Sequence, residues 1–170
     1  TLVLCADATL ENNIRTGDPT ELAALDWAEK HGISWKEVTR QHERISENPF
    51  DSDRKLMSTL NREGSHYRVH TKGAMDSLLK VVSHVRINGV DHPVSDGFRG
   101  QMESMVEQLS GQALRVLGAA CKDSDSLLSP AEMEKNLVFL GLVGMIDPPR
   151  PEVKHSIVEA IEAGITPVMI

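Results

Sequence analysis

Aromatic residues are scarce in this chain of 170 residues, of which Phe, Trp and Tyr together make up 4%. An aromatic ring beside charged residues therefore calls for a physical reason. Cysteine is rarer still, and both thiols, Cys5 and Cys121, lie inside apolar runs. This placement argues against a disulfide framework and favours a reducing compartment.

Positive charge is also in short supply, since the formal net charge is −7 at pH 7. A chain of this charge is not expected to bind nucleic acid, which attracts a basic face. No apolar run approaches the ~20 residues of a membrane span, so we expect a soluble, cytosolic domain. At physiological salt, charges beyond ~8 Å are screened, and any phosphate site must therefore be a local concentration of basic side chains.

Several motifs for phosphate, metal or nucleophile chemistry are missing. The sequence has no Gly-rich phosphate loop of the Walker type and no dinucleotide fingerprint. A calcium loop starting at Asp51 is rejected, because Leu56 and Arg62 stand where such a loop needs glycine and glutamate. His66 and His70 would share one strand face, but no third metal ligand is indicated. We interpret both as satisfied or solvated histidines.

Hydrophobic periodicity and turn signals predict a mixed succession of helices and strands. The first helix has Asp18 as N-cap, Pro19 at the first position and Glu21 at the capping-box position, and Gly32 ends it. Further helices are predicted at residues 34–41, 73–82, 98–109, 130–135 and 152–163. Strands are predicted at residues 45–49, 55–61, 67–71, 113–121, 137–146 and 165–170. A hairpin is predicted over residues 85–94, turning at Asn88-Gly89.

A proline-rich segment, Asp147-Pro148-Pro149-Arg150-Pro151, predicts a rigid boundary, because its prolines cannot take part in a strand ladder. Beyond it, the order of helix, Gly164 and apolar strand is typical of a parallel, doubly wound sheet. We therefore expect one domain over residues 1–146, followed by a rigid boundary and the cut start of a second domain over residues 147–170.

Three places in the first domain combine residues suited to a nucleotide. Phe50 next to the charges before Lys55 suits a stacked base and a phosphate, unless Phe50 is a core residue before a solvated turn. Lys72-Gly73 at a strand-to-helix junction suits an anion, unless it is an ordinary turn. Arg115 stands alone in an apolar strand and needs a partner or a ligand, unless it faces outward at an edge.

Five motifs, taken in order, resemble the nucleotide-binding domain of P-type cation-transporting ATPases, in a calcium-pump-like and bacterial-looking version. They are Gly17-Asp18-Pro19-Thr20-Glu21, Phe50-Asp51-Ser52-Asp53-Arg54-Lys55-Leu56-Met57-Ser58, Lys72-Gly73-Ala74, Leu114-Arg115-Val116-Leu117 and Gly144-Met145-Ile146-Asp147-Pro148-Pro149-Arg150. The resemblance covers essentially the whole chain, and it implies that Asp147-Pro148-Pro149-Arg150 is the hinge into the phosphorylation domain, whose first returning helix and strand would be residues 152–170. It implies an α+β fold, an antiparallel sheet flanked by helices, with ATP in a shallow pocket at one end.

The resemblance also implies which residues hold the adenine. Phe50 would stack on the ring, and Glu21 would hydrogen-bond the adenine side, with Thr20 beside it among the ATP-binding residues. Lys72 would line the base of the adenine pocket, and Gly73 would allow close approach.

On the phosphate side, the resemblance implies that Lys55 approaches the ring and phosphates, and that Arg115 contacts the phosphate or ribose with Leu117 packed nearby. Ser52 stands where calcium pumps of animal reticulum usually have arginine, so one phosphate contact is expected to be lost or moved.

In the intact pump, the resemblance implies that this domain delivers the γ-phosphate of ATP to an aspartate in an Asp-Lys-Thr-Gly-Thr motif, with Mg²⁺ as a further cofactor. This sequence contains neither that motif nor the Gly-Asp-Gly magnesium motif. We therefore expect no catalytic or metal-binding residue here, and a fragment that binds ATP without magnesium and does not hydrolyse it. Its partners would be ATP or ADP and the phosphorylation, actuator and membrane domains of the same polypeptide, at the cytoplasmic face of a membrane.

Two further expectations concern the fragment itself. The N-terminal strands that usually open such a domain are expected to be missing, which exposes a sheet edge, and the fragment is expected to be monomeric or weakly self-associating. A catalytically silent regulatory or interaction module is the alternative function, and loss of the pocket residues would favour it. A stand-alone phosphatase of the haloacid-dehalogenase type is excluded because its catalytic aspartates are absent.

Overall fold

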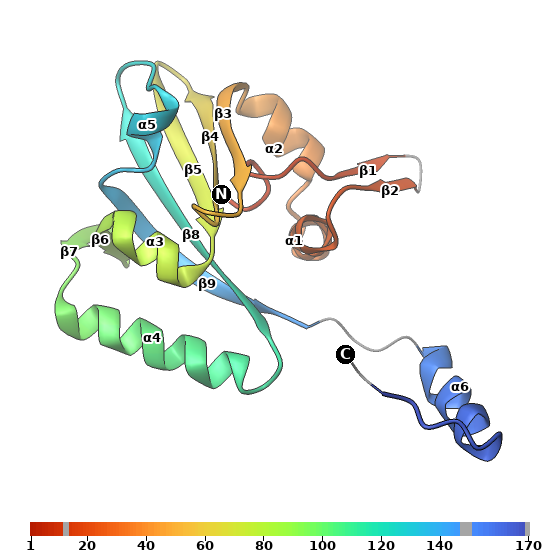
Figure 1. The fold of residues 1–170 in the computed structure, drawn as a ribbon. Helices are drawn as coiled ribbons and strands as arrows, with labels where there is room; N and C mark the ends of the chain where they lie inside the picture. The colour runs from red at the N-terminus through yellow and green to blue at the C-terminus, as the bar shows by residue number, and fades with distance from the viewer. Residues whose placement is uncertain (12–13, 147–150, 169–170) are drawn as a thin grey trace.

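The computed structural model describes residues 1–11, 14–146 and 151–168, and within them a seven-stranded sheet forms the centre of the molecule (Figure 1). Its strands lie in the order β3-β4-β5-β8-β9-β6-β7. Their bounds are β3 (Arg44–Asp51), β4 (Leu56–Glu63), β5 (His66–Gly73), β6 (Val82–Ile87), β7 (Val90–Pro93), β8 (Arg115–Ser124) and β9 (Leu137–Met145). Neighbouring strands are antiparallel except for β6 and β9, which are parallel. The predicted fold, an antiparallel sheet flanked by helices, is confirmed, with the parallel pair of β6 and β9 as the exception.

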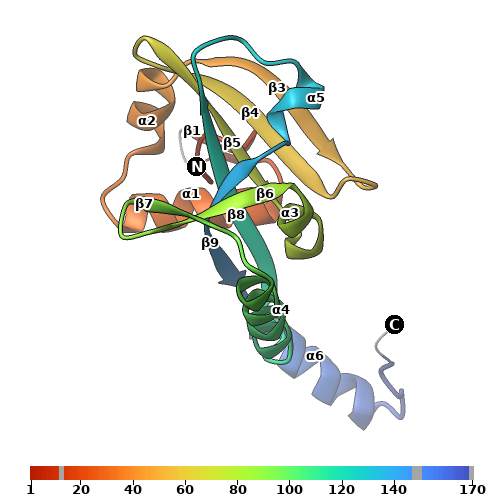
Figure 2. The same ribbon diagram turned by 90° about the vertical axis from the view of Figure 1, so that its left-hand side faces the viewer.

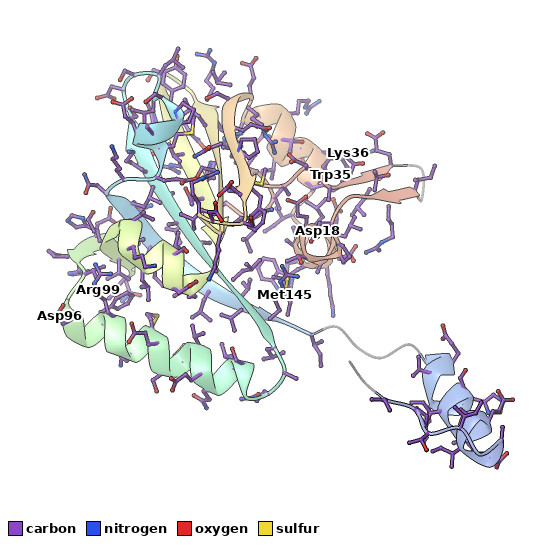
Figure 3. The ribbon with its side chains drawn as sticks, in the orientation of Figure 1. Asp18, Trp35, Lys36, Asp96, Arg99 and Met145 are labelled. Atoms are coloured by element: carbon purple, nitrogen blue, oxygen red, sulfur yellow. The ribbon has the colours of Figure 1, made fainter. Side chains whose placement is uncertain are left out.

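Helices cover both faces of this sheet. The helices of the described residues are α1 (Pro19–Lys30), α2 (Trp35–Gln41), α3 (Met75–Val81), α4 (Asp96–Ser110), α5 (Pro130–Met133) and α6 (Pro151–Glu162), and of these α6 does not cover the sheet. The helices α3 and α4 pack over β8 on one face, whereas α1 and α2 lie together with the small hairpin of β1 (Thr9–Glu11) and β2 (Ile14–Thr16) on the other side (Figures 1 and 2). The side chain of Arg99 on α4 donates to the carbonyl of Leu79, which joins α4 to the end of α3 (Figure 3).

The main core lies between the sheet and α3. Leu60 of β4, Val69 of β5, Ala120 of β8 and Leu78 of α3 are fully buried there. Gly118 lets α3 approach β8, because a Cβ at that position would lie 2.5 Å from the side chain of Leu78. The strands and α3 therefore form one rigid support for the residues at the end of the sheet.

The predicted helices begin within two residues of the predicted starts, and the predicted turn at Asn88-Gly89 is found. Asp18 caps α1 by accepting a hydrogen bond from the Thr20 N–H at 2.8 Å. Asn88 and Gly89 turn the β6–β7 hairpin with φ of 51° and 81°, the left-handed values that such a turn requires. The capping-box role of Glu21 is wrong, because its carboxylate accepts hydrogen bonds from distant groups instead of from the Asp18 N–H.

The C-terminal segment differs from the prediction. Helix α6 is present and lies apart from the sheet in both views (Figures 1 and 2). Residues 165–168 do not form the predicted strand. Their backbone has no described strand beside it to complete a ladder, and a strand without a partner is not stable in water. The predicted hinge residues Asp147, Pro148, Pro149 and Arg150 lie outside the described residues.

The structure agrees with the interpretation of the cysteines but not with that of His70. Cys5 and Cys121 are free and buried, as predicted. His66 is half-exposed, but His70 is only 4% exposed, and within the described residues its Nε2 has no hydrogen-bond partner. The interpretation of His70 as satisfied or solvated is therefore wrong for this nitrogen, because the sheet and the N-terminal segment shield it from water. None of the described helices combines the length and the apolar character needed to cross a membrane.

Candidate nucleotide-binding site

A pocket of about 400 Å³ lies where α1 begins, β3 ends, β5 meets α3 and β8 begins. The residues that line it come from four segments that are far apart in the sequence. All eight predicted site residues line this pocket: Thr20, Glu21, Phe50, Lys55, Lys72, Gly73, Arg115 and Leu117. Asp18, Ala74 and Val116 complete the lining and were not predicted as site residues, although each lies within two positions of one that was. Two larger hollows, of about 530 and 640 Å³, contain none of the eight.

A largely buried ion pair forms the floor of the pocket. The Lys72 ammonium on β5 donates to Oε1 of Glu21 on α1, and both side chains are 12% exposed. The other carboxylate oxygen of Glu21 accepts hydrogen bonds from the backbone N–H groups of Asp7 and Ala8, each at 2.9 Å. These contacts fix Lys72 and neutralise its charge. A floor of this kind suits an uncharged heteroaromatic ring better than a phosphate.

Phe50 stands at the rim of the pocket with 62% of its surface exposed. The other two phenylalanines, Phe98 and Phe139, pack edge to face in the core with ring centroids 5.7 Å apart. The alternative that Phe50 is a core residue is therefore wrong. An exposed ring at the mouth of a pocket is a surface on which a planar ligand can stack.

Gly73 does permit a close approach, and the group that approaches is the protein's own backbone. A Cβ at Gly73 would lie 2.3 Å from the carbonyl oxygen of Lys55 and 2.6 Å from the side chain of Leu56. The same Lys55 carbonyl accepts a hydrogen bond from the Ala74 N–H at 3.1 Å. Glycine at position 73 therefore lets the β3–β4 loop lie against the start of α3, which brings Phe50 and Lys55 to the pocket.

Two cations stand at the open side of the pocket. The Lys55 ammonium pairs with the Asp76 carboxylate at 2.8 Å, and this hydrogen bond lowers the pKa of Asp76. Arg115 is exposed at the start of β8 and has no ion pair or hydrogen bond with any side chain in the described part of the chain. The pKa of Asp18 is lowered chiefly by its hydrogen bond to Thr20, with a smaller contribution from the Arg115 charge. Arg115 is thus available to an anionic ligand.

A smaller hollow of about 280 Å³ adjoins this pocket on the side of Arg115. It shares Asp18, Thr20 and Arg115 with the first, and it ends at Met145 and Ile146, at the end of β9. Figure 3 labels Asp18 and Met145, which both line it. Among the described residues, no group of three or more His, Cys, Asp or Glu side chains is placed to hold a metal ion.

Comparison with known proteins gives a consistent result. Residues 1–152 match the family described as P-type ATPase, cytoplasmic domain N. The chain is 45% identical over 170 residues to calcium-transporting ATPase 1 of Bacillus cereus, which aligns with 99% of this chain and 19% of that protein. It is 38% identical over 171 residues to a calcium-transporting ATPase of Listeria monocytogenes, with 99% and 19% covered. Against calcium-transporting ATPase 1 of Saccharomyces cerevisiae it is 31% identical over 176 residues, with 98% and 18% covered. The chain thus spans about a fifth of the length of these relatives.

Proposed function

The chain belongs to the family of P-type ATPase cytoplasmic N domains, and on that premise we propose that it binds ATP and positions it for phosphoryl transfer to an aspartate in another domain. The family to which the five motifs pointed is confirmed. The proposal assigns the whole protein to cation transport, with calcium as the favoured ion because the Bacillus and Listeria relatives are calcium-transporting ATPases.

The observation that carries the proposal is that Phe50 and Arg115 stand at one pocket whose floor is the Glu21–Lys72 pair. Adenine would stack on Phe50 over the neutralised floor. The ribose and phosphates would extend past Lys55 towards Arg115, since an uncompensated guanidinium attracts phosphate oxygens. The hollow beside Arg115 leads to Ile146, so the γ-phosphate would leave the pocket on the side of the hinge.

This domain's task would be to position ATP, because phosphoryl transfer is catalysed chiefly by alignment and charge stabilisation. A base–aromatic stack is worth ~1–3 kcal/mol, and a charge-assisted hydrogen bond adds roughly 1.5–3 kcal/mol. After the entropy cost of association, these few contacts leave a dissociation constant on the order of 0.1–10 mM. Ser52 is exposed in the loop after Phe50 and brings no charge to it, which agrees with weak binding.

The division of the chain supports a role within a larger polypeptide. We propose that residues 1–146 are the nucleotide-binding domain and that residues 147–170 are a hinge and the start of the phosphorylation domain. Four apolar side chains of α6 are exposed: Val153, Ile157, Val158 and Ile161. An apolar helix face of this kind is normally covered by another element. The partners would be the phosphorylation, actuator and membrane domains of a pump, with this domain at the cytoplasmic face and Mg²⁺ used by the intact enzyme.

An ATP titration followed by calorimetry or NMR tests the pocket assignment. We expect Phe50→Ala to weaken ATP binding about tenfold, since it removes a base stack worth ~1–3 kcal/mol. Lys72→Ala is expected to weaken ATP binding as well, because it leaves the Glu21 carboxylate without its counter-charge at the floor of the pocket. Trp27→Ala is the matched control, because Trp27 is also an exposed aromatic residue but lines a different hollow. Equal affinity in the wild type and both pocket variants would refute the assignment and leave a regulatory or interaction module as the better reading. Steady-state phosphate release above background would contradict an inert fragment.

A further inference from the structure

The carboxylate of Glu134 lies outside the ATP pocket. It accepts hydrogen bonds from side chains of β3, of β4 and of the loop that joins these two strands. Its side chain is 10% exposed. Arg54 Nη1 donates to its two oxygens at 2.5 and 2.6 Å. Asn48 Nδ2 on β3 and Ser58 Oγ on β4 donate to Oε1 at 3.1 and 2.9 Å. A largely buried carboxylate with four hydrogen bonds has one well-defined position.

Arg54, which is held by Glu134, in turn fixes the backbone of the β3–β4 loop beside Phe50 and beside Lys55. Its Nη2 donates to the Pro49 carbonyl at 2.6 Å, directly before Phe50. Its backbone N–H donates to Asp51 Oδ1 at 2.9 Å. Arg54 also precedes Lys55 in the chain. The guanidinium therefore holds the backbone next to both pocket residues that this loop carries.

The sheet ladder leaves this part of β3 without other support. The register between β3 and β4 shifts between Asn48 and Asp51, so Pro49 and Phe50 have no regular partners on β4. Proline also lacks the N–H that a ladder needs. Side-chain hydrogen bonds must replace the missing ladder bonds at this point, and the bond from Arg54 to the Pro49 carbonyl is one of them.

Glu134 itself is held firmly. It directly follows α5, whose last residue, Met133, is fully buried in the main core. The helix begins with a capping box in which the side chains of Ser129 and Glu132 satisfy each other's backbone N–H groups. The carboxylate of Glu134 is thus tied to the core through α5 and does not move with the loop.

We propose that Glu134 is a positioning residue for the ATP pocket, acting through Arg54 to hold Phe50 and Lys55 in the geometry that receives the nucleotide. The inference rests on the proposed ATP binding. Glu134 does not line the pocket, and its effect arises because an aromatic ring already held in place binds a base without an ordering cost.

A mutant cycle tests this proposal. Glu134→Ala and Arg54→Ala are each expected to weaken ATP binding about 3- to 10-fold, the equivalent of losing part of one base stack. The double variant is expected to bind no more weakly than either single variant, because both changes remove the same link. Glu134→Gln keeps the shape but loses the charge, so its affinity is expected to lie between those of the wild type and Glu134→Ala.

Asp123→Ala is the matched control, since Asp123 forms a bidentate pair with Arg68 at 2.6 and 3.1 Å on the opposite face of the sheet. It is expected to leave ATP affinity unchanged. Without ATP, the NMR signals of the Phe50 ring and the Lys55 amide are expected to shift or broaden in Glu134→Ala and Glu134→Gln but not in Asp123→Ala.

Two results would overturn the inference: a lower melting temperature of Glu134→Gln with wild-type ATP affinity, or unchanged Phe50 and Lys55 signals. The parallel titration of Phe50→Ala separates this failure from a failure of the proposed function. If Phe50→Ala weakens ATP binding and the Glu134 variants do not, the pocket stands and only the role of Glu134 falls.

Discussion

The Lys72 ammonium and the Glu21 carboxylate pair across 51 residues of sequence, and the pair joins α1 to the centre of the sheet. Lys72 lies opposite Met57 of β4 and Ala119 of β8, so its backbone is held by strands on both sides. Glu21 also takes two backbone N–H groups from the segment before β1. One carboxylate thus connects the N-terminal segment, α1 and β5, and it fixes the floor of the pocket.

Replacing one member of this pair is expected to destabilise the fold more than replacing both. Glu21→Gln leaves the largely buried Lys72 ammonium without a counter-charge, and we expect the free energy of unfolding to fall by about 3 kcal/mol, the lower end of the cost for a buried pair. The double variant Glu21→Gln/Lys72→Met removes both charges and should recover part of that loss. Urea denaturation of the wild type, the single variants Glu21→Gln and Lys72→Met, and the double variant measures the effect. A double variant less stable than Glu21→Gln alone would show that the ion pair is not the main contribution of these side chains.

Gly73→Ala is expected to push the β3–β4 loop away from the start of α3. The added Cβ would lie 2.3 Å from the Lys55 carbonyl, which is backbone and cannot turn away. We expect a loss of about 1–3 kcal/mol of stability together with weaker ATP binding. Gly100→Ala in α4 is the matched control, because a Cβ there meets nothing within 4 Å. It should instead stabilise the protein by roughly 0.5–1 kcal/mol. Equal thermal stability of the two variants would contradict the close approach.

The sequence predicts the order of elements and the composition of the pocket better than it predicts contacts. Glycine at position 73 and asparagine-glycine at 88–89 are local signals, and both mark the places where the backbone needs them. Glu134 gives no such signal. Its partners Asn48, Arg54 and Ser58 are 86, 80 and 76 residues away, and only the folded sheet brings them together.

The same limit explains the wrong interpretation of Glu21. The spacing of Glu21 from Asp18 fits a capping box. In the structure, however, the Glu21 carboxylate accepts hydrogen bonds from Lys72 and from the N–H groups of Asp7 and Ala8 instead of from the Asp18 N–H. A largely buried ammonium and two backbone donors outweigh one backbone N–H. None of these competitors is a sequence neighbour of Glu21, so periodicity alone could not reveal them.

His70 is expected to make the fold sensitive to acid. Burial lowers the pKa of His70 from 6.5 to about 3, so the folded state stays unprotonated where the unfolded state takes up a proton. Between pH 6.5 and about 3, the free energy of unfolding should therefore fall as the pH falls, by about 1.4 kcal/mol per pH unit from this group. His70→Gln should flatten this slope in urea titrations from pH 7 to pH 4.5. The exposed His155→Gln is the control and should leave the slope unchanged.

Arg115→Ala is expected to show which end of the pocket holds the phosphates and which end holds the base. Arg115 is exposed at the side where the pocket continues to Met145, so it would meet phosphate oxygens and not the ring. We expect its loss to weaken ATP binding by roughly tenfold, the value of one charge-assisted hydrogen bond, and to leave adenosine binding unchanged. Phe50→Ala should instead weaken ATP and adenosine by the same factor, because the stacked base is common to both. Arg40→Ala removes the same charge from an exposed position on α2 and controls for the change in net charge. Calorimetric titrations of ATP and of adenosine into the three variants give the comparison. An equal loss of ATP and adenosine affinity in Arg115→Ala would place Arg115 at the base and reverse the proposed orientation of the nucleotide.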